Sequence, residues 1–209
     1  MDTEKGESGR MMSSESSQGR RQFLIGATSV VGGIGAVGAA VPFVKSWNPS
    51  AKAKAAGAPV EVNISKLEKG QKLVVEWRGR PVWVVRRTPE VLQNLKKLAG
   101  TLRDPGSEES VQPVYALNEY RSIKEEYLVL IGLCTHLGCS PVYRPEVGAE
   151  DLGGDKWLGG FFCPCHGSMF DMAGRVYKGV PAPTNLDVPP YYFVDENTLI
   201  IGEDGEAVA

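Results

Sequence analysis

The sequence is poor in histidine and cysteine and has no excess of positive charge. It has two histidines and four cysteines in 209 residues, and its 23 basic residues are outnumbered by 25 acidic ones. A net charge of −2, without any Lys/Arg-rich run interleaved with aromatic residues, gives no electrostatic basis for binding nucleic acid. Nucleic acid is therefore excluded as a partner, whereas a hydrophobic content of 42% is normal for a chain that folds around a core.

Near the N-terminus, one stretch lacks branched aliphatic and aromatic residues and the next lacks charged residues. Residues 1–19 contain no leucine, isoleucine, valine or aromatic residue, and their serine, glycine and charge predict a disordered tail. Residues 23–44 contain no charge, and these 22 residues are enough to cross a hydrocarbon core of about 30 Å as a helix. Their glycines are more typical of membrane helices than of soluble ones. The pattern therefore predicts one transmembrane helix rather than a buried soluble helix.

Arg20 and Arg21 precede this apolar stretch, separated from it only by Gln22, and the arrangement is similar to the twin-arginine export signal. That signal carries folded proteins across the bacterial membrane. We therefore interpret residues 20–47 as signal and anchor, with the N-terminal tail in the cytoplasm and the following domain outside. Cleavage within residues 51–58 is an alternative, but the apolar stretch is longer than a usual signal peptide, which favours an uncleaved anchor.

The rest of the chain has the pattern of a linker followed by short β-strands. Residues 48–59 are small and polar and include two prolines, which is the composition of a flexible hinge. A hairpin is predicted around Gly79, and Thr88 is the predicted N-cap of a short amphipathic helix ending at Gly100. Further short strands alternate with turns. We expect a mainly antiparallel β domain over residues 60–209, with a helical insertion and a smaller subdomain around the cysteines.

All the cysteines and both histidines lie in two short segments, CTHLGC at residues 134–139 and CPCHGS at residues 163–168. A zinc site of two cysteines and two histidines suits these residue types, but such sites usually group cysteine with cysteine and histidine with histidine. A thiol nucleophile with a histidine base would not explain four clustered cysteines. A 2Fe-2S cluster with two thiolates on one iron and two imidazoles on the other would take one cysteine and one histidine from each segment.

Together the two segments match the signature of the Rieske iron-sulfur proteins. The chain resembles in particular the Rieske subunit of bacterial cytochrome bc complexes, the ubiquinol-cytochrome c reductases. The anchor, the hinge, the helical insertion and the segment GVPAPTNLDVPPY at residues 179–191 extend this resemblance. It implies an antiparallel β-sandwich Rieske domain that holds one 2Fe-2S cluster, with a cluster-binding subdomain at about residues 132–184.

The resemblance also implies roles for individual residues. It implies the following pairs: Cys134 and Cys163 on the inner iron, His136 and His166 on the outer iron, and Cys139 with Cys165 in a disulfide. Ser168 would donate its hydroxyl to a cluster sulfide. Leu137 would shield the cluster at the quinol pocket, unless it is an ordinary loop hydrophobe. Residues 179–183 would cover the cluster, unless they form a merely rigid turn.

The function implied by the resemblance is electron transfer in a quinol-cytochrome c oxidoreductase. His166, with His136 beside it, would meet quinol; one electron would pass to the c-type cytochrome and the second to cytochrome b, contributing to the proton gradient. The complex would be dimeric and lie in the bacterial inner membrane, with the cluster domain in the periplasm. Two alternatives are a Rieske subunit of another exported enzyme, such as arsenite oxidase, and a zinc-stabilised binding domain without redox function.

Two features depart from the family pattern. Phe170 stands where mitochondrial relatives carry a tyrosine whose hydroxyl donates to a ligand cysteine sulfur. One hydrogen bond to the cluster region is therefore missing, and we expect the midpoint potential to be lower than in the relatives that carry the tyrosine. The interval between the two segments, residues 140–162, is longer than in many relatives and is predicted to bulge as a surface loop away from the metal.

Overall fold

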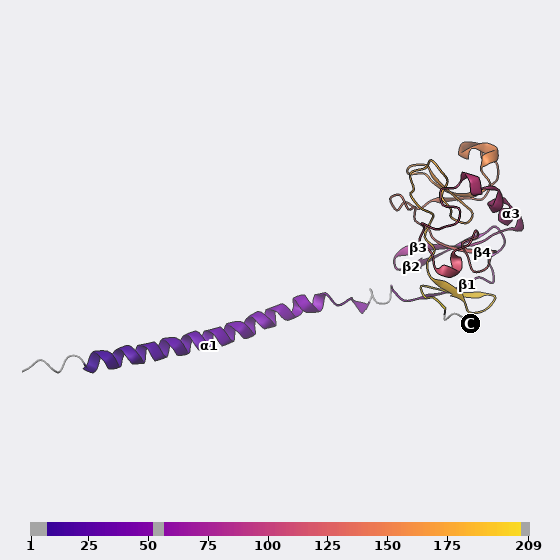
Figure 1. Cartoon of the computed structure of the whole chain (residues 1–209). Helices are drawn as coiled ribbons and strands as arrows, with labels where there is room; N and C mark the ends of the chain where they lie inside the picture. The colour runs from indigo at the N-terminus through magenta and orange to yellow at the C-terminus, as the bar shows by residue number, and fades with distance from the viewer. Residues whose placement is uncertain (1–7, 52–56, 206–209) are drawn as a thin grey trace, which may run out of the picture. The chain divides into compact units, whose positions relative to one another are not determined.

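The computed structural model describes residues 8–51 and 57–205, which fall into two compact units, residues 1–53 and 54–209 (Figure 1). Residues 52–56, in the middle of the predicted hinge, lie outside the described residues. The limits of the tail, hinge and cluster-binding subdomain therefore stay predictions. Each unit is described by itself.

The first unit is the helix α1 (Ser8–Ser46), and its stretch Gln18–Ser46 has a mean hydropathy of 1.8, long and apolar enough to cross a membrane. Its side chains from Gly19 onward are exposed in the isolated chain, as expected for a helix whose solvent is lipid. The helix begins at Ser8, within the segment that the sequence predicts to be a disordered tail, and residues 1–7 lie outside the described residues. Extending an existing helix avoids the unfavourable nucleation step, a gain that composition alone does not reveal.

Over residues 57–205, the second unit has three three-stranded antiparallel sheets. The first has the order β1 (Val60–Asn63), β9 (Thr198–Ile201), β8 (Tyr191–Phe193). The second has the order β2 (Lys72–Trp77), β3 (Arg80–Arg86), β4 (Tyr127–Ile131). The third has the order β5 (Val142–Arg144), β6 (Gly160–Cys163), β7 (Ser168–Asp171). The mainly antiparallel β architecture is confirmed, and the two cysteine segments adjoin the third sheet.

The predicted hairpin and helix are present. Strands β2 and β3 are joined by Arg78 and Gly79, which both have positive φ, as a two-residue hairpin turn of type I′ requires. Thr88 caps the helix α3 (Pro89–Lys97) by accepting a hydrogen bond from the Val91 N–H. The helix ends before the predicted Gly100, because the chain tightens into the 3-10 turn η1 (Ala99–Thr101). A further 3-10 turn, η2 (Val114–Ala116), follows in the insertion.

One tryptophan packs against the approaches to both cysteine segments. Strand β4 is buried at every position and leads to Gly132, where an added Cβ would lie 2.2 Å from the Trp83 ring. Only glycine fits there. The Trp83 ring also stacks on Phe161 of β6 with ring centroids 5.0 Å apart. Because Phe161 lies two residues before Cys163, this contact fixes the base of the second segment relative to the first.

The interval between the two segments is only in part the surface loop that its length predicted. Its ends form β5 and β6, so they belong to the sheet that carries the second segment. Between these strands, the turns η3 (Glu150–Leu152) and η4 (Gly154–Lys156), orange in Figure 1, lie at the periphery of the unit. They precede Trp157, which is buried and stacks on Tyr177 at 6.0 Å. A buried indole anchors the loop, a contact that the loop's length could not predict.

Candidate metal centre

The first cysteine segment is a tight loop that begins three residues after β4. The Cys134 N–H donates to the Cys139 carbonyl at 2.7 Å, and the Gly138 N–H donates to the Cys134 carbonyl at 2.9 Å. Gly138 has a φ of 80°, which glycine adopts without strain. The loop buries the Cys134 thiol at its base and leaves Leu137 at its tip 70% exposed.

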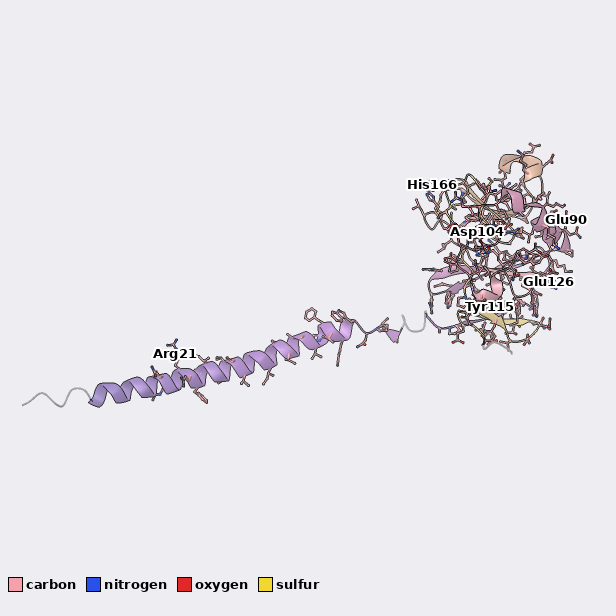
Figure 2. All side chains as sticks on the ribbon, in the orientation of Figure 1. Arg21, Glu90, Asp104, Tyr115, Glu126 and His166 are labelled. Carbon is pink, nitrogen blue, oxygen red and sulfur yellow. A yellow bond between two sulfur atoms is a disulfide. The ribbon has the colours of Figure 1, made fainter. Side chains whose placement is uncertain are left out.

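The second segment repeats this geometry between β6 and β7. The Gly167 N–H donates to the Cys163 carbonyl at 2.9 Å, and Gly167 also has a positive φ. Cys163 ends β6 opposite Ser168 of β7, and both residues are buried. His166 is exposed at the tip, and Figure 2 shows it at the surface of the unit, at the end opposite β1. In each loop a buried cysteine therefore lies below a histidine nearer the surface.

The structure brings the two loops together. Cys139 and Cys165 form a disulfide between them, and the rings of His136 and His166 lie edge to face with centroids 4.7 Å apart. Cys134 and Cys163 remain as free, buried cysteines. Although the sulfur atoms of Cys139, Cys163 and Cys165 lie within 4.8 Å of one another, the disulfide occupies two of them, so this trio is not the metal site.

The remaining donors fit a 2Fe-2S cluster. Burial raises the pKa of the Cys134 thiol, and the neighbouring Cys163 raises it further, while hydrogen bonds from the His136 backbone N–H and the Ser168 hydroxyl lower it. The Cys134 thiol, whose pKa is raised, is therefore poorly placed to ionise without a compensating cation, and a metal supplies one. Thiolates below and imidazoles nearer the surface match the two-cysteine, two-histidine donor set of the Rieske type.

A proline-containing stretch, here called the proline segment (residues 179–185), contacts both loops. The Thr135 hydroxyl donates to the Thr184 carbonyl at 2.7 Å. The Ala182 N–H donates to the Ser168 Oγ at 3.0 Å. Each loop therefore has one hydrogen bond to this segment. Sequence reasoning missed Thr135, although its place between two proposed ligands was a usable signal.

Phe170 lies on the face of the third sheet that carries Ser168 and Cys163. Ser168 and Phe170 are two residues apart on β7, so their side chains share one face, and the register places Cys163 opposite Ser168 on that face. The Phe170 side chain is fully buried. A hydroxyl at this position would therefore point into the interior beside the ligand loops and not into solvent.

Small antiparallel sheets that present two disulfide-linked Cys/His loops define a Rieske-type iron-sulfur protein. Residues 59–191 match the family model of the Rieske 2Fe-2S domain, and residues 11–50 match that of the ubiquinol-cytochrome c reductase Fe-S subunit TAT signal. The chain is 62% identical over 185 residues to the ubiquinol-cytochrome c reductase iron-sulfur subunit of Allochromatium vinosum, covering 88% of this chain and 89% of the relative. The chain therefore belongs to the family of ubiquinol-cytochrome c reductase iron-sulfur subunits.

A second curated relative and one solved structure are also similar to this chain. The corresponding subunit of Blastochloris viridis is 44% identical over 194 residues, covering 92% of this chain and 98% of the relative. A chain of a solved hyperthermophilic respiratory complex III is 29% identical, with a TM-score of 0.45, and covers 85% of this chain and 98% of that chain.

Family membership confirms several of the predictions. The cofactor is one 2Fe-2S cluster of the Rieske type, the role is electron transfer, and the chain is a subunit of a ubiquinol-cytochrome c reductase. The disulfide is present. The matched export signal and the apolar helix α1 fit a membrane-anchored subunit.

Proposed function

We propose that Cys134 and Cys163 hold the inner iron of the cluster and that His136 and His166 hold the outer iron. The bound cluster supplies a one-electron acceptor whose potential the imidazole ligands raise above that of an all-cysteine cluster. The observation that carries this assignment is the arrangement of the donors, with both free thiols buried and His166 exposed. Of the four proposed ligands, His166 is the exposed one and therefore the one that a substrate would meet.

We further propose that His166 meets the quinol hydroxyl. An exposed imidazole at the loop tip can form a hydrogen bond with the hydroxyl and take its proton as the electron leaves. His136 lies beside it, and the exposed Leu137 next to His136 gives the tip an apolar surface suited to a quinone ring. The electron would then pass to the c-type cytochrome of the complex, and the second quinol electron to the cytochrome b subunit.

The proposed topology places the N-terminus in the cytoplasm and the cluster domain in the periplasm, with α1 in the bacterial inner membrane. The twin-arginine match supports it, because that signal exports proteins that have already folded. A disulfide between Cys139 and Cys165 also suits an oxidising compartment. Residues 48–59 would act as the hinge between quinol and cytochrome positions, and the complex would be a dimer.

Electron paramagnetic resonance of membranes reduced with ascorbate tests the proposal. We expect the spectrum of a 2Fe-2S cluster with mixed ligands, and we expect it to shift when an inhibitor occupies the quinol site. Co-purification with b-type and c-type haems would support the cytochrome partners, whereas a molybdenum subunit would favour an arsenite-oxidase type of complex. Metal analysis that finds zinc, and neither iron nor acid-labile sulfide, would refute the proposal.

Replacing Phe170 with tyrosine is expected to raise the midpoint potential. A new hydroxyl would donate a hydrogen bond toward a cysteine ligand and stabilise the reduced, more negative cluster. One hydrogen bond is worth about 1 kcal/mol, or about fivefold in the reduction equilibrium, which is about 40 mV at 59 mV per tenfold. An EPR redox titration measures this shift in midpoint potential.

Phe162→Tyr is the matched control, because Phe162 pairs with Met169 on the opposite face of the sheet. An equal shift in Phe162→Tyr would contradict the account.

A further inference from the structure

The helical insertion holds the proline segment in place from both ends. At the first end, the Lys178 N–H donates to the Thr101 carbonyl at 2.9 Å, and the Lys178 ammonium reaches the Gly100 carbonyl at 3.0 Å. Near the other end, the Arg103 side chain donates to the Pro183 carbonyl at 3.2 Å. The insertion that follows α3 therefore contacts the same segment that contacts both ligand loops.

The loop that follows, residues 104–110, is built as a fixed platform. The Asp104 carboxylate accepts hydrogen bonds from the Glu108 N–H at 2.8 Å, the Glu109 N–H at 3.1 Å and the Ser110 hydroxyl at 2.7 Å. Asp104 is buried, and Figure 2 shows it inside the unit, in that view between the ends that carry His166 and Tyr115. Hydrogen bonds to an ionised group are among the stronger ones, so the platform keeps one shape.

Asn185 joins this platform to the proline segment. Its side-chain amide donates to the Asp104 carbonyl at 2.9 Å and to the Ser107 Oγ at 3.0 Å, and its Oδ1 accepts from the Val176 N–H at 2.8 Å. Its backbone N–H donates to the Ser110 Oγ at 3.1 Å. The side chain is fully buried, so each lost bond would leave a partner without water to replace it.

Two short steps connect Asn185 to the ligand loops. The preceding residue, Thr184, accepts the hydrogen bond from Thr135, which lies between Cys134 and His136. Three residues before Asn185, the Ala182 N–H donates to the Ser168 oxygen. The same Ser168 hydroxyl also forms a hydrogen bond with the Cys134 thiol, so its oxygen is held by the proline segment while its hydrogen is available to the ligand side. The position of the proline segment therefore determines where this hydroxyl points.

We propose that Asn185 is a positioning residue which, together with Asp104, Ser107 and Ser110, holds the proline segment in register and thereby sets the reduction potential of the cluster. The hydrogen bonds of Asn185 reach none of the four proposed ligands, so it acts through Ala182, Ser168 and Thr184. This inference rests on the proposed ligand set. It assigns a redox function to the insertion loop, which is remote from the ligands in sequence.

The test is an EPR redox titration of the intact complex carrying single substitutions. Asn185→Ala is expected to lower the equilibrium constant for reduction about fivefold, which is about 40 mV at 59 mV per tenfold, because the Ser168 donor loses its orientation. Ser110→Ala removes one contact to Asn185 and is expected to shift the potential less, in the same direction. Ser110→Thr keeps the hydroxyl and is expected to restore the potential of the unmodified protein.

The matched control is Asn118→Ala. Asn118 also uses its amide for several backbone bonds, donating to the Tyr115 and Ser122 carbonyls at 3.1 and 3.0 Å and accepting from the Tyr120 N–H at 3.0 Å, but none reaches the proline segment. The midpoint potential of the cluster in Asn118→Ala is expected to stay unchanged even if the domain becomes less stable. An equal shift in Asn118→Ala, or unchanged potentials in both Asn185→Ala and Ser110→Ala, would overturn the inference.

Two remaining results are also decisive. If Asn185→Ala does not assemble a cluster, the inference is tested by comparing the midpoint potentials of Ser110→Ala and Ser110→Thr. Ser110 is half-buried, and the first substitution removes its hydroxyl while the second keeps it. If the unmodified complex shows no mixed-ligand spectrum, the proposed ligand set fails first. That failure differs from the failure of the present inference, in which the spectrum is normal but the midpoint potential does not change in Asn185→Ala.

Discussion

Replacing Cys163 with serine is expected to abolish the cluster and with it quinol-dependent cytochrome c reduction. Cys163 is 2% exposed and is one of two free cysteines in the part of the chain that the structure describes. A serine hydroxyl does not ionise in such a buried position, so it cannot replace a thiolate on iron. We expect complete loss of the EPR signal, and cytochrome c reduction at background level, in membranes that still contain the full-length chain.

The disulfide supplies the matched control for that substitution. The double change of Cys139 and Cys165 to serine removes the covalent link between the loops but leaves the four proposed ligands. Since the link joins residues 26 apart, its loss should destabilise the domain by about 3 to 4 kcal/mol in the chain-entropy model. The cluster signal should therefore survive, in smaller amount and with lower heat resistance. A retained mixed-ligand spectrum in Cys163→Ser would refute the ligand assignment.

Much of the candidate site could be predicted from the sequence because its determinants are local. Each loop closes on itself through a hydrogen bond from a glycine N–H to the carbonyl of a cysteine four residues earlier. Such a loop has its residue types at fixed spacing, and the pattern identifies it. The hairpin at Arg78 and Gly79 was predictable for the same reason, because the turn geometry selects its residues.

The parts that could not be predicted depend on contacts between residues far apart in the chain. Asn185 and Asp104 are 81 residues apart, and neither has an unusual neighbour that would mark it as a partner of the other. The burial of Trp157 against Tyr177 likewise depends on how the interval folds back. Periodicity and spacing report local geometry, whereas these hydrogen-bonded and stacked pairs exist only once the sheets have assembled.

A buried group of charges around Asp171, the last residue of β7, could also not be predicted from the sequence. Burial lowers the pKa of Arg87 and of Arg121 to about 10, while the carboxylate of Asp171 raises both. Arg175 pairs with Asp171 at 2.7 Å, with side-chain exposures of 3% and 0%. One carboxylate therefore stabilises three buried guanidinium groups. It also fixes the turn after β7 by accepting hydrogen bonds from the Ala173 and Arg175 N–H groups.

Asp171→Asn is therefore expected to destabilise the domain more than Arg175→Met does. The asparagine removes the carboxylate from its buried ion pair with Arg175 and also removes its favourable electrostatic interaction with Arg87 and Arg121. Breaking one such buried pair costs about 3 to 5 kcal/mol. That loss corresponds to about 6 to 20 °C in the temperature at which the intact complex loses its cluster spectrum on heating. Arg175→Met leaves Asp171 facing Arg87 and Arg121, so its carboxylate stays compensated.

The double variant should lose less than the sum of the two single variants, because the second change removes a charge that the first left unpaired. Asp151→Asn, which breaks a surface pair with Arg144, should cause no measurable change, since Asp151 is 63% exposed and water replaces the lost contact. Equal losses in Asp171→Asn and Arg175→Met would show that the two residues act only as an isolated pair. The asymmetry is therefore the decisive measurement, because it shows that Asp171 has stabilising partners besides Arg175: the two other arginines and the N–H groups of the turn after β7.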